Sequence, residues 1–104
     1  MCDVYSSMAP ERYESTTRSI RLRGFVTSIR LENEYWEILE YMAQEEGATV
    51  PQFISDFYDE VLEKRGEVKN LTSMLRVACV IYISRGRNWR AAGREEPALS
   101  LSVG

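Results

Sequence analysis

The sequence predicts a mainly α protein in which one N-terminal strand is followed by three helices and pairs with the same strand of a second copy. Three observations lead to this fold class. Apolar residues alternate over residues 25–31, they then recur at helical spacing in three later segments, and no second segment offers the strand a partner of comparable quality. The chain has 104 residues, of which 44% are hydrophobic and 28% charged, so it has the composition of one small globular domain.

The predicted strand follows a polar leader. Residues 1–17 show little periodicity and are interpreted as an arm, residues 18–85 as the domain, and residues 86–104 as a flexible tail. Within the stretch IRLRGFVTSIRL at 20–31, the apolar phase changes at Gly24, which suggests a bulge or bend there. Over 25–31 the alternation places Thr27, Ile29 and Leu31 on one face, and the opposite face carries Val26, Ser28 and Arg30.

Three helices are expected at about 33–46, 50–64 and 71–85. The first carries an apolar stripe at i, i+3, i+4 and i+7 from Tyr35 and stops at Gly47. The second opens with a capping box, in which Thr49 is the N-cap and Gln52 the third helical residue. The third is capped by Asn70 or Thr72 and is apolar on nearly every side, which predicts burial or packing on two surfaces at once.

A lone strand implies a second chain. An unpaired strand leaves its backbone N–H and C=O groups without partners, so two copies related by a two-fold axis would form an antiparallel ribbon. About 50 ordered residues also rarely build a sufficient core alone. The third helix could join such dimers into a higher oligomer, with Ile81 and Ile83 as candidate contacts. The alternative is a monomeric three-helix bundle with an extended leader, which would leave Phe25, Ile29 and Leu31 on an unpaired edge.

Charge is divided unevenly along the chain. The total is −3, but residues 1–31 carry +2, residues 32–70 carry −8 and residues 71–104 carry +3. From 18 to 31 there are four arginines and no acid. Because salt limits the reach of a charge to about 8–10 Å, this stretch can bind phosphate although the whole chain is acidic. The alternative is that these arginines only keep an exposed edge soluble.

Most catalytic and metal chemistry is excluded by composition. The chain has no histidine, which removes Ser-His-Asp and Cys-His catalysis and histidine-ligated metals. Cys2 and Cys79 form no CxxC pair, so we expect no metal and no cofactor. Cys79 and Tyr82 lie on an apolar helix without an activating base, and an enzyme is not expected. The longest apolar run, 77–83, is too short to span a membrane, and no signal peptide is recognised, so we expect a cytoplasmic protein.

The ordered set of segments resembles the ribbon-helix-helix superfamily. The segments that carry the resemblance are GFVTSIRLE at 24–32, YWEIL at 35–39, EGAT at 46–49 and NLTSMLRV at 70–77. The last of these is similar to an extra C-terminal helix found in one bacterial subfamily of short ribbon-helix-helix proteins. The openings MCDVY at 1–5 and Tyr13-Glu14 are similar to that subfamily as well.

The resemblance implies a homodimer that binds double-stranded DNA, most simply as a transcriptional repressor. By position, Val26, Ser28 and Arg30 would read bases in the major groove. The residues that would bind phosphate are Thr49, Val50 and Gln52 at the second helix, with Arg18, Arg21 and Arg23 from the leader. Thr49 could equally be a plain N-cap, and Pro51 removes one donor from this turn.

An interaction module is the alternative function. The same fold forms the dimerising half of antitoxins, so the arginine-rich tail or the acidic middle segment could bind a partner protein. A solvated tail without a partner is the simpler interpretation. If DNA is the ligand, the protein would be found at the nucleoid when bound.

Overall fold

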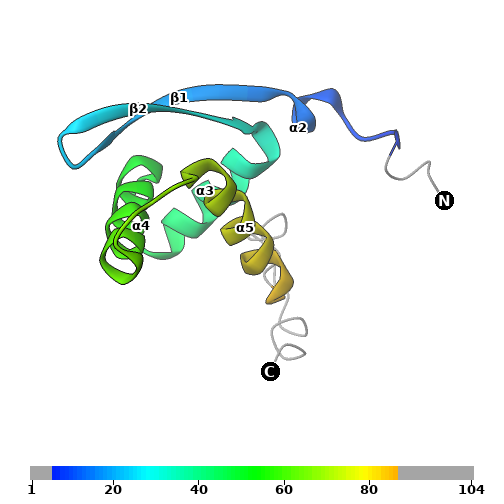
Figure 1. Ribbon diagram of the computed structural model, residues 1–104. Helices are drawn as coiled ribbons and strands as arrows, with labels where there is room; N and C mark the ends of the chain where they lie inside the picture. The colour runs from blue at the N-terminus through cyan, green and yellow to red at the C-terminus, as the bar shows by residue number, and fades with distance from the viewer. Residues whose placement is uncertain (1–5, 87–104) are drawn as a thin grey trace.

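A two-stranded ribbon covers one side of a layer of helices. The computed structural model of the chain describes residues 6–86, with the order α2 (Pro10–Tyr13), β1 (Ser15–Leu22), β2 (Phe25–Glu32), α3 (Asn33–Glu45), α4 (Val50–Arg65) and α5 (Leu71–Ser84). Figure 1 shows the ribbon above and α3, α4 and α5 together beneath it. The predicted class, a strand ribbon followed by three helices, is confirmed.

The ribbon is a hairpin within one chain. β1 and β2 pair antiparallel from Ser15↔Glu32 to Leu22↔Phe25, which leaves Arg23 and Gly24 as a two-residue turn. Both turn residues have positive φ, 43° and 92°, as a turn that follows the right-handed twist of the strands requires. The prediction of a lone strand is therefore wrong, because β2 pairs with β1 of its own chain. The change of phase at Gly24 is this turn and not a bulge.

The two faces of the hairpin have different environments. The register places Ile20 and Leu22 of β1 on the same face as Ile29 and Leu31 of β2, and all four are buried against the helices. They join a core that α3, α4 and α5 supply through Leu39, Ile54, Leu75 and other buried side chains. The predicted division of β2, with Ile29 and Leu31 inward and Val26, Ser28 and Arg30 outward, is confirmed.

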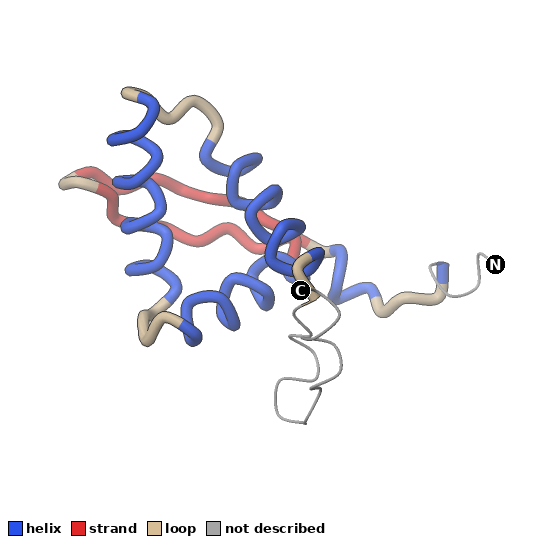
Figure 2. Tube along the Cα trace, turned by 90° about the horizontal axis from the view of Figure 1, so that it is seen from below, coloured by secondary structure: helices blue, strands red, loops and turns tan. Residues whose placement is uncertain are grey.

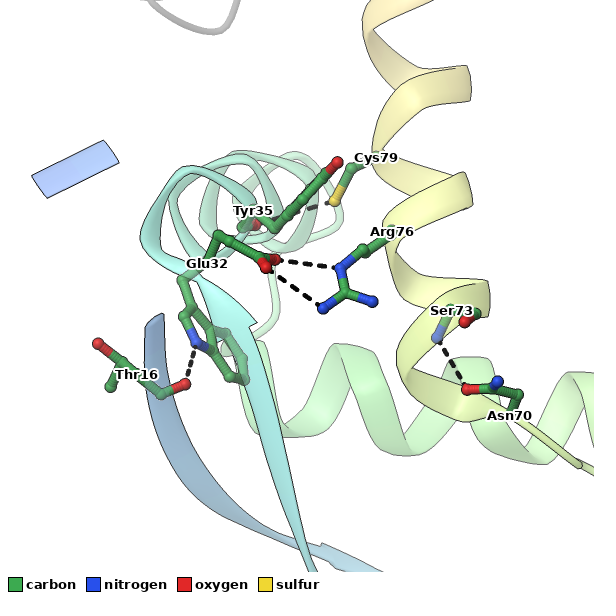
Figure 3. Close-up of polar contacts among 8 residues, drawn as sticks. Thr16, Glu32, Tyr35, Asn70, Ser73, Arg76 and Cys79 are labelled. Atoms are coloured by element: carbon green, nitrogen blue, oxygen red, sulfur yellow. Dashed lines mark hydrogen bonds and ion pairs between the residues drawn. The ribbon is translucent and has the colours of Figure 1, made fainter. Parts of the chain in front are cut away.

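The three main helices begin and end within one residue of their predicted bounds. Thr49 caps α4 by accepting from the N–H of Gln52 at 3.2 Å, and Asn70 caps α5 by accepting from the N–H of Ser73 (Figure 3). Only half of the predicted capping box forms, because the Gln52 side chain donates to Asp56 instead. Seen from the helical side, the strands lie behind the helices and the hairpin turn extends past α4 (Figure 2). No helix among residues 6–86 is long and apolar enough to cross a membrane.

Among residues 6–86, only one side of the helix α5 is packed against other elements. Leu75 and Cys79 are fully buried against α3 and β2, whereas Val77, Val80 and Ile81 are about half exposed. The expectation that α5 is buried or packed on two surfaces is thus met on one surface within the described part of the chain. Of the two candidate contacts for oligomers, Ile81 is exposed, whereas Ile83 is half-buried against the core.

The predicted arm contains regular structure. Its residues 10–13 form α2, and its residues 15–17 begin β1. Asn33 fastens this segment to α3: its side-chain amide donates to the carbonyl of Glu11 at 3.0 Å, and its backbone N–H donates to the carbonyl of Glu14 at 2.8 Å. Arg12 adds an ion pair to Glu34 at 2.9 Å. The predicted tail, apart from Gly86, lies outside the described residues.

Candidate nucleic-acid interface

The outward face of the hairpin carries the three predicted base-reading residues. Val26, Ser28 and Arg30 are all exposed and alternate with the buried residues of β2. The register adds four exposed residues of β1 on the same face: Ser15, opposite Glu32, and three in the pairs Thr17↔Arg30, Ser19↔Ser28 and Arg21↔Val26. We call the six residues of these last three pairs the outer face. Hydroxyl groups occupy its middle, with one arginine toward each end.

The dimensions of the hairpin suit a DNA groove. Eight residues of strand extend for roughly 26 Å, and an antiparallel pair is about 5 Å between strand axes. The major groove of DNA is about 12 Å wide and can admit a two-stranded ribbon. All three helices that cover the hairpin lie on its other side, so the described part of the chain leaves the outer face open (Figures 1 and 2).

Sequence reasoning missed half of the outer face because it missed β1. Thr17 and Ser19 fell in or next to the segment interpreted as an arm, and Arg21 was assigned to phosphate alone. Two signals could have found them. The alternation of Ile20 and Leu22 with polar residues is a strand pattern, and a phase change across two residues that include Gly24 is a hairpin signal.

A hollow next to the outer face gathers most of the predicted phosphate-binding residues. It lies between the hairpin turn and the start of α4 and is lined by Arg21, Arg23, Gly24, Thr49, Pro51, Gln52 and Ser55. Four of the six predicted residues meet there. Arg23 is fixed at the rim by an ion pair with Asp59 of α4, with 2.8 Å between Nε and Oδ1.

The first turn of α4 has few donors left for an anion. Thr49 uses its hydroxyl as the N-cap, the N–H of Gln52 donates to that hydroxyl, and Pro51 has no N–H. The side chain of Val50 is buried, so this residue could offer only its backbone. The structure thus assigns Thr49 the capping role that the sequence left open as an alternative, and the arginines supply the charge in this hollow.

Arg18 lies apart from the other leader arginines. It belongs to the inward face of β1, half-buried, and its guanidinium carbon lies 4.6 Å from the ring centroid of Trp36. The indole N–H of Trp36 in turn donates to the carbonyl of Thr16 at 2.9 Å (Figure 3). A guanidinium over an indole is a cation–π contact, so Arg18 helps to hold β1 on α3.

The two layers differ in charge. Residues 15–31 contain four arginines and no acid, whereas most acids lie on the helices. Glu32 ends the ribbon and is turned toward α5, where it accepts from Arg76 Nε at 3.0 Å (Figure 3). A hydrogen bond from its own backbone N–H, and then the bond from Arg76, lower the pKa of Glu32. Glu32, which follows Arg30 on the outward register of β2, is therefore paired on the helical side.

Residues 6–86 show no arrangement that suggests a reaction. The thiol of Cys79 is buried 3.8 Å from the carbonyl of Tyr35 (Figure 3), and burial raises its pKa to about 12. A thiol in that state is a poor nucleophile. Within this part of the chain no three Cys, Asp or Glu side chains gather in a way that could hold a metal ion.

Comparison with known proteins decides the family. A family model described as a ribbon-helix-helix domain matches residues 15–83, from the start of β1 almost to the end of α5. The chain belongs to the ribbon-helix-helix family. Members of this family usually bind DNA, typically as dimers. The match includes α5, so that helix is part of this ribbon-helix-helix domain.

A solved structure has the same fold. An uncharacterized protein from Bordetella pertussis Tohama I is 38% identical to this ribbon-helix-helix protein, with a TM-score of 0.80. The alignment covers 96% of this chain and 77% of that one. A search of curated proteins gives no match.

Proposed function

We propose that this ribbon-helix-helix protein binds double-stranded DNA by inserting the outer face of its hairpin into the major groove. It would act as a homodimer in the cytoplasm, at the nucleoid when bound, and most simply as a transcriptional repressor that occludes its site. The observation that carries the proposal is the outer face itself: six exposed residues on one ribbon, with two arginines and three hydroxyl groups, while Glu32, the next residue along this face, is paired with Arg76.

Each kind of side chain on the outer face has a matching partner on DNA. The guanidinium of Arg30 can donate two hydrogen bonds to O6 and N7 of guanine, and the hydroxyls of Ser19 and Ser28 can bond to either kind of base edge. Val26 can contact the methyl group of thymine. Arg21 lies where the outer face meets the hollow at the start of α4, which suits a phosphate beside the groove.

A complete ribbon in one chain changes the role of the dimer. Because β1 and β2 both come from the same polypeptide, a single copy already presents a two-stranded reading surface. The second copy would then add another reading surface and a second set of phosphate contacts. Affinity and salt dependence should therefore depend on dimerisation more than base preference does.

The test is a selection of bound sequences from random duplex DNA, followed by mobility-shift titrations on the selected site. Wild type should enrich a short motif that contains guanine. Arg30→Ala should bind the selected site more weakly by about 1–3 kcal/mol and should enrich no guanine at that position. Arg65→Ala, which removes an exposed arginine at the end of α4, is the matched control and should change neither result.

Two outcomes would refute the proposal. One is a wild-type protein that enriches no motif and shows no affinity for duplex DNA at low salt. The other is an Arg30→Ala variant that selects the same motif as wild type with the same affinity, which would show that the outer face is not the reading surface.

A further inference from the structure

The hairpin turn contains an arginine at a position where the backbone disfavours one. Arg23 and Gly24 are the two residues of the turn, and Arg23 has a φ of 43°. Turns of this kind favour asparagine, aspartate or glycine, because a larger side chain is strained at positive φ. Among residues 6–86, Arg23 is the only residue other than glycine with positive φ. Its side chain is about half exposed, so the strain serves no packing in the core and indicates a role at the surface.

One edge of the Arg23 guanidinium is held and the other is free. Its Nε donates to Oδ1 of Asp59 on α4 at 2.8 Å, and within residues 6–86 its two terminal nitrogens donate no hydrogen bond. The ion pair of Arg76 with Glu32 differs, because Arg76 donates through both Nε and a terminal nitrogen. Asp59 thus fixes the guanidinium of Arg23 without occupying its outer edge.

The free edge belongs to a residue that lines the hollow at the start of α4. Arg21 and Arg23 both line this hollow, whereas Asp59 and the other acids do not. The Asp59 carboxylate therefore contacts the guanidinium from outside the hollow. An arginine held in this way can still donate two parallel hydrogen bonds from its terminal nitrogens to two oxygens of one phosphate.

We propose that Asp59 is a positioning residue for DNA binding, which holds the Arg23 guanidinium so that its two terminal nitrogens meet a phosphate beside the major groove. This inference rests on the proposed function and deepens it by naming the contact that orients one phosphate-binding arginine. A donor that is already oriented loses less rotamer freedom on binding. An acid on α4 would thus strengthen binding to DNA, although its charge alone opposes it.

A second contact keeps the hairpin on α4 when Asp59 is replaced. Phe25 packs edge-on against Tyr58 of α4, with ring centroids 6.1 Å apart and an angle of 74° between the rings. The pair of Arg23 and Asp59 is itself well exposed, with side chains 53% and 44% exposed, so it contributes little to stability. Substitution of Asp59 should therefore free the guanidinium and leave the hairpin in place.

Two variants of equal charge isolate the role of the Asp59 carboxylate. Asp59→Ala removes the acceptor, whereas Asp59→Asn keeps an acceptor oxygen at a similar place. Fluorescence anisotropy with a labelled DNA duplex measures the affinity of the full chain over a range of salt concentrations. Asp59→Ala should bind about two- to tenfold more weakly than wild type, because the freed arginine must lose its rotamer freedom on binding. Asp59→Asn should recover most of that loss.

Two controls show whether the effect acts through Arg23. Arg23→Ala should reduce the salt slope by about 0.9, as expected for one lost phosphate contact, and in that background Asp59→Ala and Asp59→Asn should bind equally. Glu63→Gln removes another acid one turn further along α4 and should bind at least as tightly as wild type. Circular dichroism checks that all variants keep the helical content of wild type.

Nuclear magnetic resonance tests the orientation of Arg23 without DNA. The Nε–H of Arg23 should exchange with water more slowly in wild type than in Asp59→Ala, because Asp59 accepts its hydrogen bond. Equal exchange rates in the two proteins would overturn the inference.

The binding measurements separate the inference from the proposed function. If wild type binds the duplex, three results would each overturn the inference alone: equal affinity of Asp59→Ala and Asp59→Asn, tighter binding by Asp59→Ala than by wild type, or an undiminished effect of Asp59→Ala in the Arg23→Ala background. A wild type that binds no duplex DNA refutes the proposed function and, with it, the phosphate contact of Arg23.

Discussion

The two faces of one hairpin differ in almost every physical respect. The inward residues Ile20, Leu22, Ile29 and Leu31 are at most 2% exposed and contact three helices. The six residues of the outer face are exposed, and all of them except Val26 are polar or cationic. Because side chains alternate along a strand, the same sixteen residues specify both the fold and the surface that we propose for DNA.

This difference means that stability and binding can be changed separately. A substitution on the inward face removes contacts within the core, whereas one on the outward face removes only groups that face solvent. Neighbouring residues on one strand therefore form natural pairs of variants. Comparison of the two variants in such a pair tests whether the two faces are as independent as their burial indicates.

The largest expected effect is on the inward face. Leu31→Ala should lower the free energy of unfolding by about 2–5 kcal/mol, because Leu31 is fully buried and its removal leaves a cavity. Arg30→Ala, one residue earlier and exposed, should change it by less than about 0.5 kcal/mol. Urea unfolding of both variants measures the contrast. A similar loss in the two variants would show that the faces are not independent.

The helices and the inward face of β2 could be predicted from sequence because each depends on a local pattern. The apolar stripe from Tyr35, the stop at Gly47 and the N-cap Thr49 are signals within one turn of the elements they define. The faces of β2 followed from alternation in the same way. The fold class could be predicted from the order of these elements along the chain.

The strand β1 was missed because its strongest evidence is not local. Its first residues, from Ser15 to Ser19, are polar, and their pairing is decided by what β2 can reach after the turn at Gly24. The position of Arg18 over Trp36 also depends on tertiary packing. The sequence positions of the arginines could not separate Arg18 from Arg21, because the face that each occupies is set by the register of the hairpin.

Arg18 and Arg21 occupy opposite faces of β1, so their substitution should have different effects. Arg21→Ala should weaken binding to duplex DNA and reduce the salt slope of the binding constant by about 0.9, as expected for one lost phosphate contact. Arg18→Ala should leave the salt slope closer to that of wild type and instead cost about 0.5–1 kcal/mol of stability, because it loses the contact with Trp36.

Salt titrations of DNA binding, together with urea unfolding, measure both quantities for each variant. If Arg18→Ala reduces the slope as much as Arg21→Ala and unfolds like wild type, the inward placement of Arg18 does not hold in solution. The hollow at α4 would then have to include it.

The hairpin turn sets the register of both faces. A substitution there should lower the free energy of unfolding by less than one in the core. Gly24 has a φ of 92°, and a Cβ built there meets no atom within 4 Å, so any cost of Gly24→Ala comes from the backbone. We expect a loss of about 1 kcal/mol in the free energy of unfolding. Gly24→Asn should cost less, since asparagine tolerates positive φ better. Equal stability of wild type and Gly24→Ala would argue against this two-residue turn.

The smallest effect on stability is expected at Glu32, the last residue of β2. Its register is that of the outward face, yet its side chain reaches Arg76 on α5. The lowered pKa of Glu32 in the folded state means that ionised Glu32 stabilises the protein above the unfolded pKa of about 4.3. That contribution is lost as the pH falls through the folded pKa. It should stay below about 1 kcal/mol, because both side chains are about one-third exposed to solvent.

Comparison of wild type with Glu32→Gln over a range of pH tests this sign. The difference in unfolding free energy should be largest near neutral pH, shrink as Glu32 is protonated, and decrease in high salt. Glu63→Gln, on the exposed side of α4, controls for the loss of one charge. If the difference between wild type and Glu32→Gln grows on acidification, the ion pair with Arg76 does not stabilise the fold. The end of β2 would then behave like the rest of the outward face.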